Sequence, residues 1–493
     1  MTQDPGFDAI IAALGTGPHA DETAITYPGE RLSWAELDGR SAARARRLVS
    51  LGAQPDDFVA ISLPNGIEHH ISAFAAWRAG ATPCILPTKL PGHELAQIVE
   101  LAAPRVLVRD GDAPPGVTQL VPGDDGDAAV DLPADAAAQH WKAVTSGGST
   151  GRPKLIVDHA PARLGARLEG LVDLVGLPRG GFILNPGPLY HNAPFLFTSL
   201  ALLVGSRVIG LHRFDAEEAL RLIERERVEW VCLVPTMMQR IWNLPEAVRN
   251  RYDLSSLRCV CHMAAACPPW LKQAWIDWLG PERILEVYAG TEGAALLITG
   301  EEWLRKPGSV GKAPPELVTI RDESGAPCPP CEIGEIFFGG DAGTRFHYIG
   351  AEAKLDDGGG LSLGDLGWID ADGYLFLSDR RSDMIIRGGA NIYAAEVEAA
   401  LGEHPAVADA VVVGLPCPDL GQRVHAIVQA DADLAIHAVD SFVRTRLAGY
   451  KCPESYEIVG DALRSDAGKV RRAALRDERL AWLKDGKPFQ AAR

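Results

Sequence analysis

Apolar positions in the first hundred residues alternate between two spacings. Residues 58–63 and 83–86 are short continuous apolar runs, which are typical of strands buried on both faces. Between them, Ile67, Ile71 and Phe74 recur at helical spacing. A strand, a helix and a second strand in this order predict a parallel sheet covered by helices, and therefore an α/β fold.

Local signals predict where further elements begin and end. The capping box Ser33-Trp34-Ala35-Glu36 predicts a helix that runs to about Leu48. Asp372-Gly373 predicts a hairpin turn. Residues 111–138 are rich in Asp, Ala, Pro and Gly, so we expect a surface excursion there. Near the C-terminus, β and α patterns alternate again, with strands expected at 410–413 and 424–428 and helices at 396–401 and 439–447.

Composition narrows the class of protein. A chain of 493 residues exceeds what one hydrophobic core usually organises, so we expect at least two domains. The net charge of −17 argues against a nucleic acid or an anionic membrane surface as partner. The longest apolar run, 194–205, is too short to span a bilayer, and the N-terminus lacks the features of a signal peptide. These observations predict a cytoplasmic protein.

The nine cysteines show no disulfide framework. Cys328 and Cys331 form a lone C-x-x-C, and Cys259, Cys261 and Cys267 lie near His262. A redox or zinc role would need a second pair or a thioredoxin-like context. Reduced structural thiols are the expected state.

Residues 145–154, T-S-G-G-S-T-G-R-P-K, combine glycines, hydroxyls and one ammonium. Such groups can converge on a phosphate, and the flanking apolar runs predict two strands closed by a tight loop. The loop is not of the Walker type, because Lys154 is followed by Leu155 rather than by a hydroxyl residue. Residues 288–293, Y-A-G-T-E-G, add small residues that let a nucleotide approach and a carboxylate suited to magnesium.

The pattern S-G-G-S-T-G-x-P-K resembles the phosphate loop of the adenylate-forming superfamily, which holds acyl-CoA synthetases, luciferases and the adenylation domains of peptide synthetases. Further motifs follow in that family's order between about Leu32 and Lys469: P-L-x-H at 188–191, Y-x-x-T-E at 288–292, G-D-L at 364–366 and G-K at 468–469. The resemblance implies a large N-terminal domain of stacked α/β sheets, residues 1–380. It also implies a small mobile α+β lid, residues 381–493, with its hinge near Ser382.

The resemblance also implies roles for individual residues. Catalysis would rest on Lys469, Thr291, Glu292 and His191. Magnesium would be held by Glu292 and Thr150. Nucleotide and coenzyme A would contact Thr145, Ser146, Gly147, Gly148, Ser149, Thr150, Gly151, Lys154, Ala265, Ala266, Tyr288, Ala289, Gly290, Asp365, Arg380, Gly388 and Gly389. The acid would contact His191, Asn192, Phe195, Met237, Ala264 and Gly290. At 264–266 alanines stand where the family usually has glycines, which disfavours a strained turn.

The implied reaction is ATP-dependent ligation of a carboxylic acid to coenzyme A through an acyl-adenylate, with Mg²⁺ as cofactor. Because Met237, Met238, Trp242, Trp270 and Phe195 lie in segments resembling the acyl site, we expect a bulky apolar acid, such as a polycyclic terpenoid, a steroid or a medium-to-long acyl chain.

Several alternatives remain open at this point. Ser382 stands where the family normally has Asp or Lys, so an acyl-AMP ligase that performs only the first half-reaction is the main one. An amino-acid adenylation domain is disfavoured because 189–200 holds no carboxylate. Nothing in the sequence supports a luciferase-like oxidase, and a non-catalytic nucleotide sensor would not need both Lys469 and Glu292. The sequence leaves the oligomeric state open, and a homodimer is compatible with it.

Overall fold

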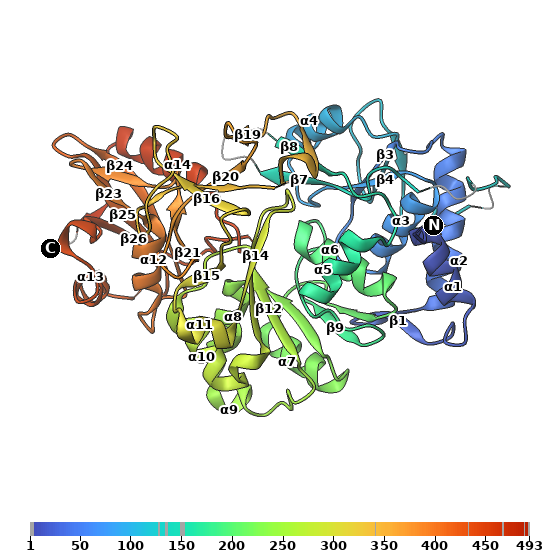
Figure 1. The fold of residues 1–493 in the computed structure, drawn as a ribbon, viewed down its shortest axis with the longest axis horizontal. Helices are drawn as coiled ribbons and strands as arrows, with labels where there is room; N and C mark the ends of the chain where they lie inside the picture. The colour runs from blue at the N-terminus through green and yellow to red at the C-terminus, as the bar shows by residue number, and fades with distance from the viewer. Residues whose placement is uncertain are drawn as a thin grey trace.

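The computed structural model describes residues 4–126, 129–133, 137–147, 153–340, 342–431, 433–465, 468–487 and 489–491. Gly148, Ser149, Thr150 and Gly151 of the predicted phosphate loop lie outside these ranges, and only the backbone of Ser146 and Gly147 is described. The predicted α/β class is confirmed: a large N-terminal region of several sheets is followed by a smaller C-terminal region, drawn in orange and red in Figure 1.

The first sheet has the strand order β14-β13-β12-β11-β9-β10-β1-β2. Its strands are β1 Thr23–Tyr27, β2 Glu30–Ser33, β9 Phe182–Asn185, β10 Arg207–Gly210, β11 Trp230–Leu233, β12 Cys259–Met263, β13 Ile284–Ala289 and β14 Ala295–Thr299. Pairing is parallel from β1 through β13, and the two outer pairs, β1 with β2 and β13 with β14, are antiparallel. All four residues of β11 are buried, as continuous apolar strands of parallel sheets should be.

The second sheet has the order β18-β8-β7-β4-β3-β5-β6. Its strands are β3 Phe58–Ser62, β4 Thr82–Ile85, β5 Val106–Arg109, β6 Thr118–Leu120, β7 Ala143–Gly147, β8 Pro153–Asp158 and β18 Phe346–Ile349. The predicted strands at 58–63 and 83–86 are confirmed as β3 and β4. β7 and β8 pair antiparallel on either side of the undescribed phosphate-loop residues.

Helices cover and connect these sheets. Before the C-terminal region they are α1 Phe7–Thr16, α2 Trp34–Ser50, α3 Ile67–Arg78, α4 Gly92–Ala102, α5 Ala166–Leu174, α6 Asn192–Leu203, α7 Ala216–Arg225, α8 Pro235–Trp242, α9 Glu246–Arg249, α10 Pro269–Leu279, η1 Pro281–Arg283, α11 Gly300–Arg305 and η2 Ala342–Thr344. The capping box of α2 is confirmed, since the Ser33 side chain accepts from the Glu36 amide at 3.2 Å and Glu36 accepts from the Ser33 amide at 2.8 Å. No helix in the described ranges is both long and apolar enough to cross a membrane.

A third, antiparallel sheet leads toward the C-terminal region. Its strands are β15 Ser309–Lys312, β16 Val318–Arg321, β17 Gly334–Phe338, β19 Lys354–Leu355, β20 Leu361–Ile369 and β21 Tyr374–Arg380. The predicted hairpin turn joins β20 to β21: Gly373 has φ +82°, and its amide donates to Asp370. Glycine adopts this left-handed conformation without steric cost.

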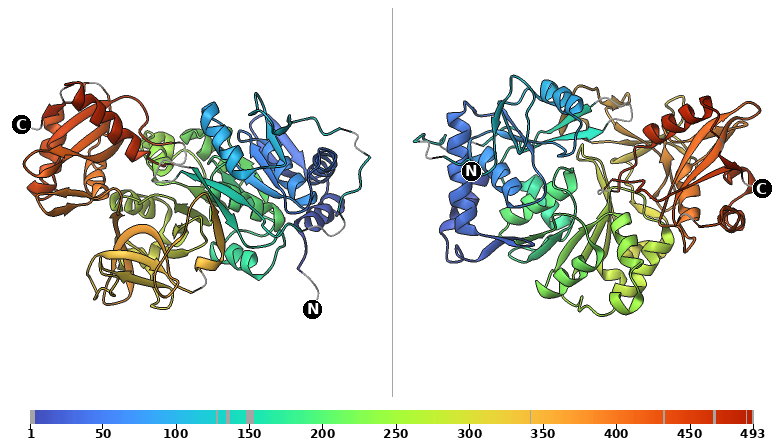
Figure 2. Two further views of the ribbon diagram at one scale, coloured as in Figure 1. Left: turned by 90° about the horizontal axis from the view of Figure 1, so that it is seen from above. Right: turned by 180° about the vertical axis from the view of Figure 1, so that it is seen from behind.

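The C-terminal region has a sheet and a hydrophobic core of its own and forms a separate lobe in Figure 2. Its elements are β22 Ile385–Arg387, β23 Ala390–Ile392, α12 Ala394–Gly402, β24 Asp409–Cys417, β25 Gly421–Gln429, α13 Ile436–Arg444, η3 Gly449–Lys451, β26 Ser455–Val459, α14 Arg472–Lys484 and β27 Gln490–Ala491. The strands and helices predicted from residue 396 onward are confirmed, although β24 and β25 are longer than expected.

The surface excursion expected at 111–138 lies mostly at the surface over its described residues, and it contains β6, which pairs in parallel with β5 at the sheet edge. A three-residue strand is too short to show a period. One local prediction is wrong: the alanines at 264–266 were expected to disfavour a strained turn after β12, yet Ala264 has φ +72° although alanine disfavours the left-handed region. The cysteines are all free, as predicted.

Candidate active site

A cavity of about 2380 Å³ lies between the N-terminal sheets and the C-terminal lobe. It exceeds the usual 300–1,000 Å³ of a single small-molecule site, so it has room for more than one ligand. Most of the predicted site residues whose side chains are described line it, namely Thr145, Lys154, His191, Asn192, Met237, Ala264, Ala265, Ala266, Tyr288, Ala289, Gly290, Thr291, Glu292, Asp365, Arg380, Ser382 and Lys469.

Glu292 forms the acidic centre of this cavity and is 8% exposed. Its Oε1 accepts a 2.5 Å hydrogen bond from the Tyr348 hydroxyl and lies 3.8 Å from Lys154 Nζ. The Lys154 ammonium in turn lies 3.8 Å from the centre of the Tyr348 ring. Burial lowers the pKa of Lys154, and the nearby Arg380 lowers it further, whereas Glu292 opposes both. The carboxylate is therefore held in place from two sides.

The residues present fit a magnesium ion that is bound largely by its substrate. Within the described residues, no group of three His, Cys, Asp or Glu side chains is arranged to hold a metal alone. Magnesium commonly binds one or two carboxylates together with substrate phosphates and waters. Glu292, beside the phosphate-loop strands, can supply such a carboxylate; Thr150 lies outside the described residues.

Asp365 on β20 presents a second carboxylate to the cavity. Its Oδ2 accepts a 2.8 Å hydrogen bond from the Tyr288 hydroxyl, and Arg380 Nε lies 3.3 Å from Oδ1. Burial raises the pKa of Asp365, whereas Arg380 and Tyr288 favour its ionised form. The Tyr288 ring contacts Phe338, with ring centres 5.7 Å apart. Tyr288 thus holds the carboxylate of Asp365, and both residues were predicted to contact the nucleotide or coenzyme A.

Lys469 reaches the cavity from the lobe on the loop between β26 and α14. At Gly468, φ is +72°, and an added Cβ would lie 3.2 Å from Thr236 Oγ1 at the start of α8. The loop therefore approaches residues 234–236 closely, and glycine allows that approach. Desolvation of the Lys469 ammonium lowers its pKa, and the nearby positive charge of Arg380 lowers it further, whereas the negative charge of Glu292 raises it. Its side chain is nevertheless exposed to the cavity.

The first turn of α6 presents polar atoms to the same space. His191 is the N-cap, and its Nε2, like Asn192 Oδ1, is buried without a hydrogen-bond partner among the described residues. Burial lowers the pKa of His191 to about 3, with a further contribution from Lys469, so the imidazole is neutral at physiological pH. These atoms can form hydrogen bonds to a ligand at the end of the helix.

Three predicted contacts lie elsewhere. Phe195 is buried in the core, stacked on Trp141 with ring centres 6.3 Å apart, and is absent from the cavity wall. Leu196 and Phe197 face the cavity instead, because successive helical residues point about 100° apart. Gly388 and Gly389 form the turn between β22 and β23, with φ of +55° and +82°, and are not among the described residues that line the cavity.

Of the other apolar residues expected at the acyl site, some line the cavity and some do not. Met237 lines the cavity, but Met238 on the next position of α8 is fully buried in the core. Trp242 packs against Trp278 and Arg249. Trp270 is likewise missing from the described lining residues.

Sequence reasoning missed two features of the wall. Tyr348 is placed beside Glu292 by the pairing of β18 with β8, where Tyr348 lies opposite Ile156. A charged cluster stands on the same wall: Asp158 lies 3.2 Å from Lys142 and 3.0 Å from Arg167. No local motif marks either feature.

Comparison with known proteins agrees with this architecture. Residues 16–348 match the pattern of the AMP-binding enzyme family, and 396–469 match the AMP-binding enzyme C-terminal domain. The chain therefore belongs to the family of AMP-binding enzymes, as its motifs predicted.

Three similar proteins bear on the function. The chain is 33% identical to a feruloyl-CoA synthase of Amycolatopsis sp., covering 93% of this chain and 96% of the relative. It is 29% identical to a long-chain-fatty-acid–CoA ligase of Mycobacterium tuberculosis, covering 91% and 93%. The structure of o-succinylbenzoate coenzyme A synthetase from Bacillus subtilis in complex with ATP and magnesium ion superimposes with a TM-score of 0.82, at 26% identity over 96% of this chain and 100% of the other.

Proposed function

We propose that the protein is an AMP-forming acid–thiol ligase that converts a bulky hydrophobic carboxylic acid into its coenzyme A thioester. The observation that carries this proposal is that Lys469, Thr291, Glu292 and Lys154 line one cavity together with many apolar residues from α5, α6 and α8. The similar proteins named above are synthetases and ligases of coenzyme A, which supports the complete reaction over the adenylation-only alternative.

In the first step, a carboxylate oxygen of the acid attacks the α-phosphorus of ATP. A bond forms between them, the bond from that phosphorus to the bridging oxygen breaks, and pyrophosphate leaves. No general base is needed, because a carboxylic acid is already ionised at neutral pH. Lys469 and Lys154 offer positive charge, and Thr291 a hydroxyl, where negative charge builds up. Magnesium, when held by Glu292, would neutralise phosphate charge.

The neutral state of His191 suits this step. An imidazolium would form an ion pair with the acid's carboxylate and reduce its nucleophilicity, whereas a neutral ring can orient the carboxylate by a hydrogen bond. Burial of the ring keeps it neutral, because desolvation disfavours the charged form. We assign Asn192 to the same positioning task at the N-terminus of α6.

For the second step we propose that residues 381–493 rotate as a lid about Ser382. The thiol of coenzyme A would then attack the acyl carbon, the acyl–phosphate bond would break, AMP would leave, and the thiol proton would pass to solvent. Lys469 faces the cavity while the Gly388-Gly389 turn lies outside it, so the orientation seen here suits adenylation. A serine can act as the hinge, because a hinge needs only to absorb backbone rotation. ATP and coenzyme A as co-substrates favour the cytoplasm as its location.

We infer the substrate class from the acyl wall, which is the part of the cavity lining that α5, α6 and α8 contribute. The residues that α5, α6 and α8 contribute there are mainly apolar: Leu168, Leu171, Leu174, Leu196, Phe197 and Met237. An apolar wall of this extent favours an aromatic, polycyclic or long-chain acid over acetate.

The test is ATP–pyrophosphate exchange over a panel of carboxylic acids, with and without coenzyme A, followed by mass spectrometry. We expect exchange with bulky apolar acids and an acyl-CoA product when coenzyme A is added. Activity confined to acetate and other short acids would refute the substrate class. Accumulation of acyl-AMP that coenzyme A cannot discharge would refute the complete ligase and implicate Ser382.

Two phenylalanines on α6 provide a matched pair for the acyl wall. Phe197→Ala should change the relative kcat/KM values across the acid panel, because that ring lines the cavity. Both rings are 2% exposed, so both alanine variants should lower the free energy of unfolding by about 3–5 kcal/mol. Phe195→Ala should nevertheless leave acid preference unchanged, because Phe195 does not line the cavity. The same change in preference from both variants would contradict this division.

A further inference from the structure

The loop that carries Lys469 is held at both ends by one carboxylate on α12. Arg464, five positions before Lys469 on this loop, places Nη2 3.2 Å from Glu398 Oε2. Arg472, after the loop, pairs through Nη1 with the other oxygen, Oε1. The side chains of Glu398, Arg464 and Arg472 are only 11%, 17% and 14% exposed. A single buried carboxylate thus bridges two residues that flank the catalytic loop.

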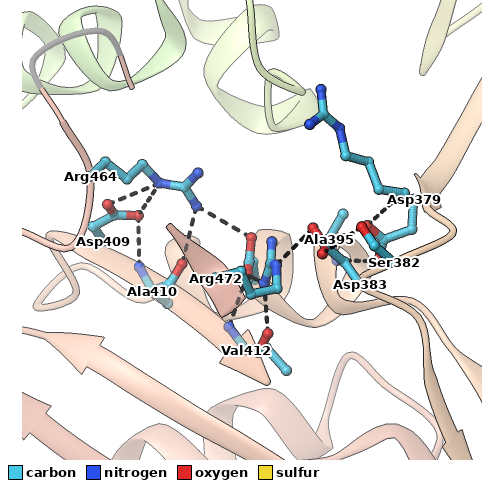
Figure 3. A network of polar contacts seen from close by, with 11 residues as sticks. Asp379, Ser382, Asp383, Ala395, Asp409, Ala410, Val412, Arg464 and Arg472 are labelled. Carbon is cyan, nitrogen blue, oxygen red and sulfur yellow. Dashed lines mark hydrogen bonds and ion pairs between the residues drawn. The ribbon is translucent and has the colours of Figure 1, made fainter. Parts of the chain in front are cut away.

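Each arginine has a second anchor on β24, as Figure 3 shows for Arg464 with Asp409 and Ala410 and for Arg472 with Val412. Arg464 Nε lies 3.0 Å from Asp409 Oδ1, and its Nη2 donates to the Ala410 carbonyl at 3.2 Å. Arg472 Nη1 donates to the Val412 carbonyl at 2.6 Å. The network therefore joins both ends of the loop to α12 and β24 as one unit.

The same network reaches the hinge. Arg472 Nε lies 3.0 Å from Asp383 Oδ2, and the Ser382 hydroxyl donates to Asp383 Oδ1 at 3.0 Å. Next to it, the Ala395 amide in the first turn of α12 donates to Asp379 Oδ2 at 3.2 Å. Figure 3 shows these groups in sequence from Arg464 to Asp379. The hinge and the lysine loop are thus connected through charged side chains.

We propose that Glu398 is a positioning residue for Lys469, acting through Arg464 and Arg472 to fix the loop where its ammonium meets the α-phosphate. This inference rests on the proposed adenylation function. The loop needs such anchoring, because it contains Gly468 in a left-handed conformation and carries an exposed lysine. Without Glu398, two buried guanidinium groups would lose the counter-charge that they share. The loop would then sample more positions, and misplacement by about 1 Å can cost roughly 100-fold in rate.

The test compares Glu398→Gln with Glu403→Gln. Glu403 follows α12 and pairs with Arg446 at 2.6 Å on the lobe surface, so its variant loses one exposed ion pair away from the loop. For Glu398→Gln we expect adenylation kcat to fall about 10- to 100-fold with little change in the KM for ATP. Glu403→Gln should stay within about twofold of wild type.

Two further measurements distinguish a specific effect on the position of Lys469 from a general loss of structure in the lobe. Conversion of preformed acyl-AMP and coenzyme A to the thioester should keep its rate in Glu398→Gln, because Lys469 is not used there. In a Lys469→Ala background, Glu398→Gln should cause no further loss of adenylation, because residues that act as a unit are not additive. Equal losses in both half-reactions, or full additivity with Lys469→Ala, would overturn the proposal.

The outcomes remain distinguishable from failure of the function itself. If the wild-type protein shows no pyrophosphate exchange with any acid of the panel, the proposed function fails. If wild type is active and Glu398→Gln adenylates normally, only the positioning role fails. Should Glu398→Gln not fold, Glu398→Asp keeps the charge on a shorter side chain; selective loss of adenylation supports the role, and a wild-type rate overturns it.

Discussion

The two walls of the cavity hold their charged groups in different ways. On the N-terminal wall, Glu292 and Asp365 are each bonded directly by a tyrosine hydroxyl, from Tyr348 and Tyr288, at 2.5 and 2.8 Å. On the lobe wall, Lys469 has no such contact recorded within the described residues; the ends of its loop are anchored instead, through Arg464, Arg472 and Glu398.

This difference matches what each wall has to do in the proposed reaction. A binding surface for ATP benefits from groups fixed before the substrate arrives, since no reorganisation is then needed during the reaction. A lysine that serves one half-reaction and then leaves needs a rigid carrier rather than fixed contacts at its ammonium. The comparison teaches that a charged group can be positioned either by direct contacts to its side chain, as for Glu292 and Asp365, or by fixing the segment that carries it, as for Lys469.

The largest expected effect comes from removing the charge on the lobe wall. Lys469→Ala should lower adenylation by about 100- to 1,000-fold, as loss of one preorganised donor does in other enzymes. ATP binding should be retained, because the N-terminal wall remains intact. Pyrophosphate exchange and nucleotide binding would be measured together, with Lys487→Ala as a control on the surface of the lobe. Full exchange in Lys469→Ala would break the comparison.

A smaller loss should follow when the loop is kept from docking. Gly468→Ala should lower adenylation about tenfold, because a methyl group there strains the backbone and approaches Thr236. Gly486→Ala is the matched control: φ is +71° there, but nothing lies within 4 Å of the added carbon. It should lower the thermal midpoint slightly and leave adenylation unchanged. Equal adenylation losses in both variants would attribute the effect to backbone strain alone.

On the N-terminal wall, Tyr348→Phe should lower adenylation by about three- to tenfold, which corresponds to the net loss of one typical hydrogen bond. The concentration of magnesium needed for half-maximal exchange should rise, because Glu292 is less well oriented. Titrating magnesium in the exchange assay measures this. Tyr450→Phe, at an exposed residue of the lobe, is the control. An unchanged magnesium requirement would argue against Glu292 as the ligand.

The smallest expected effect is a shift in the pH dependence of the adenylation rate, caused by Arg380 on the N-terminal wall acting on Lys469 on the lobe wall. Arg380 lowers the pKa of Lys469, so the lysine loses its proton at lower pH than it otherwise would. Arg380→Gln should raise that pKa, and the basic limb of the adenylation profile should move to higher pH even though the maximal rate falls. Rate profiles for wild type and variant, compared by shape, test this. A basic limb that stays in place would mean that Lys469 does not set it.

The sequence alone was enough to predict the features that depend only on residues close together in the chain. The capping box at Ser33, the turn at Gly373 and the order of the nucleotide motifs are all local, because caps, turns and loops take their chemistry from a few adjacent side chains. Hence the fold class and most of the residues around the cavity could be predicted. Within α6, however, periodicity could not tell that Phe197 and not Phe195 faces the cavity.

Only the tertiary structure decided which distant groups meet. Tyr348 reaches Glu292 across 56 positions because of the register between β18 and β8. Glu398 joins Arg464 and Arg472 across 66 and 74 positions because β24 and α12 pack together. Strand register and packing are set by the whole core, and no short segment carries that information. The sequence therefore pointed to most of the residues that line the cavity, and the fold decided which neighbours hold their side chains in place.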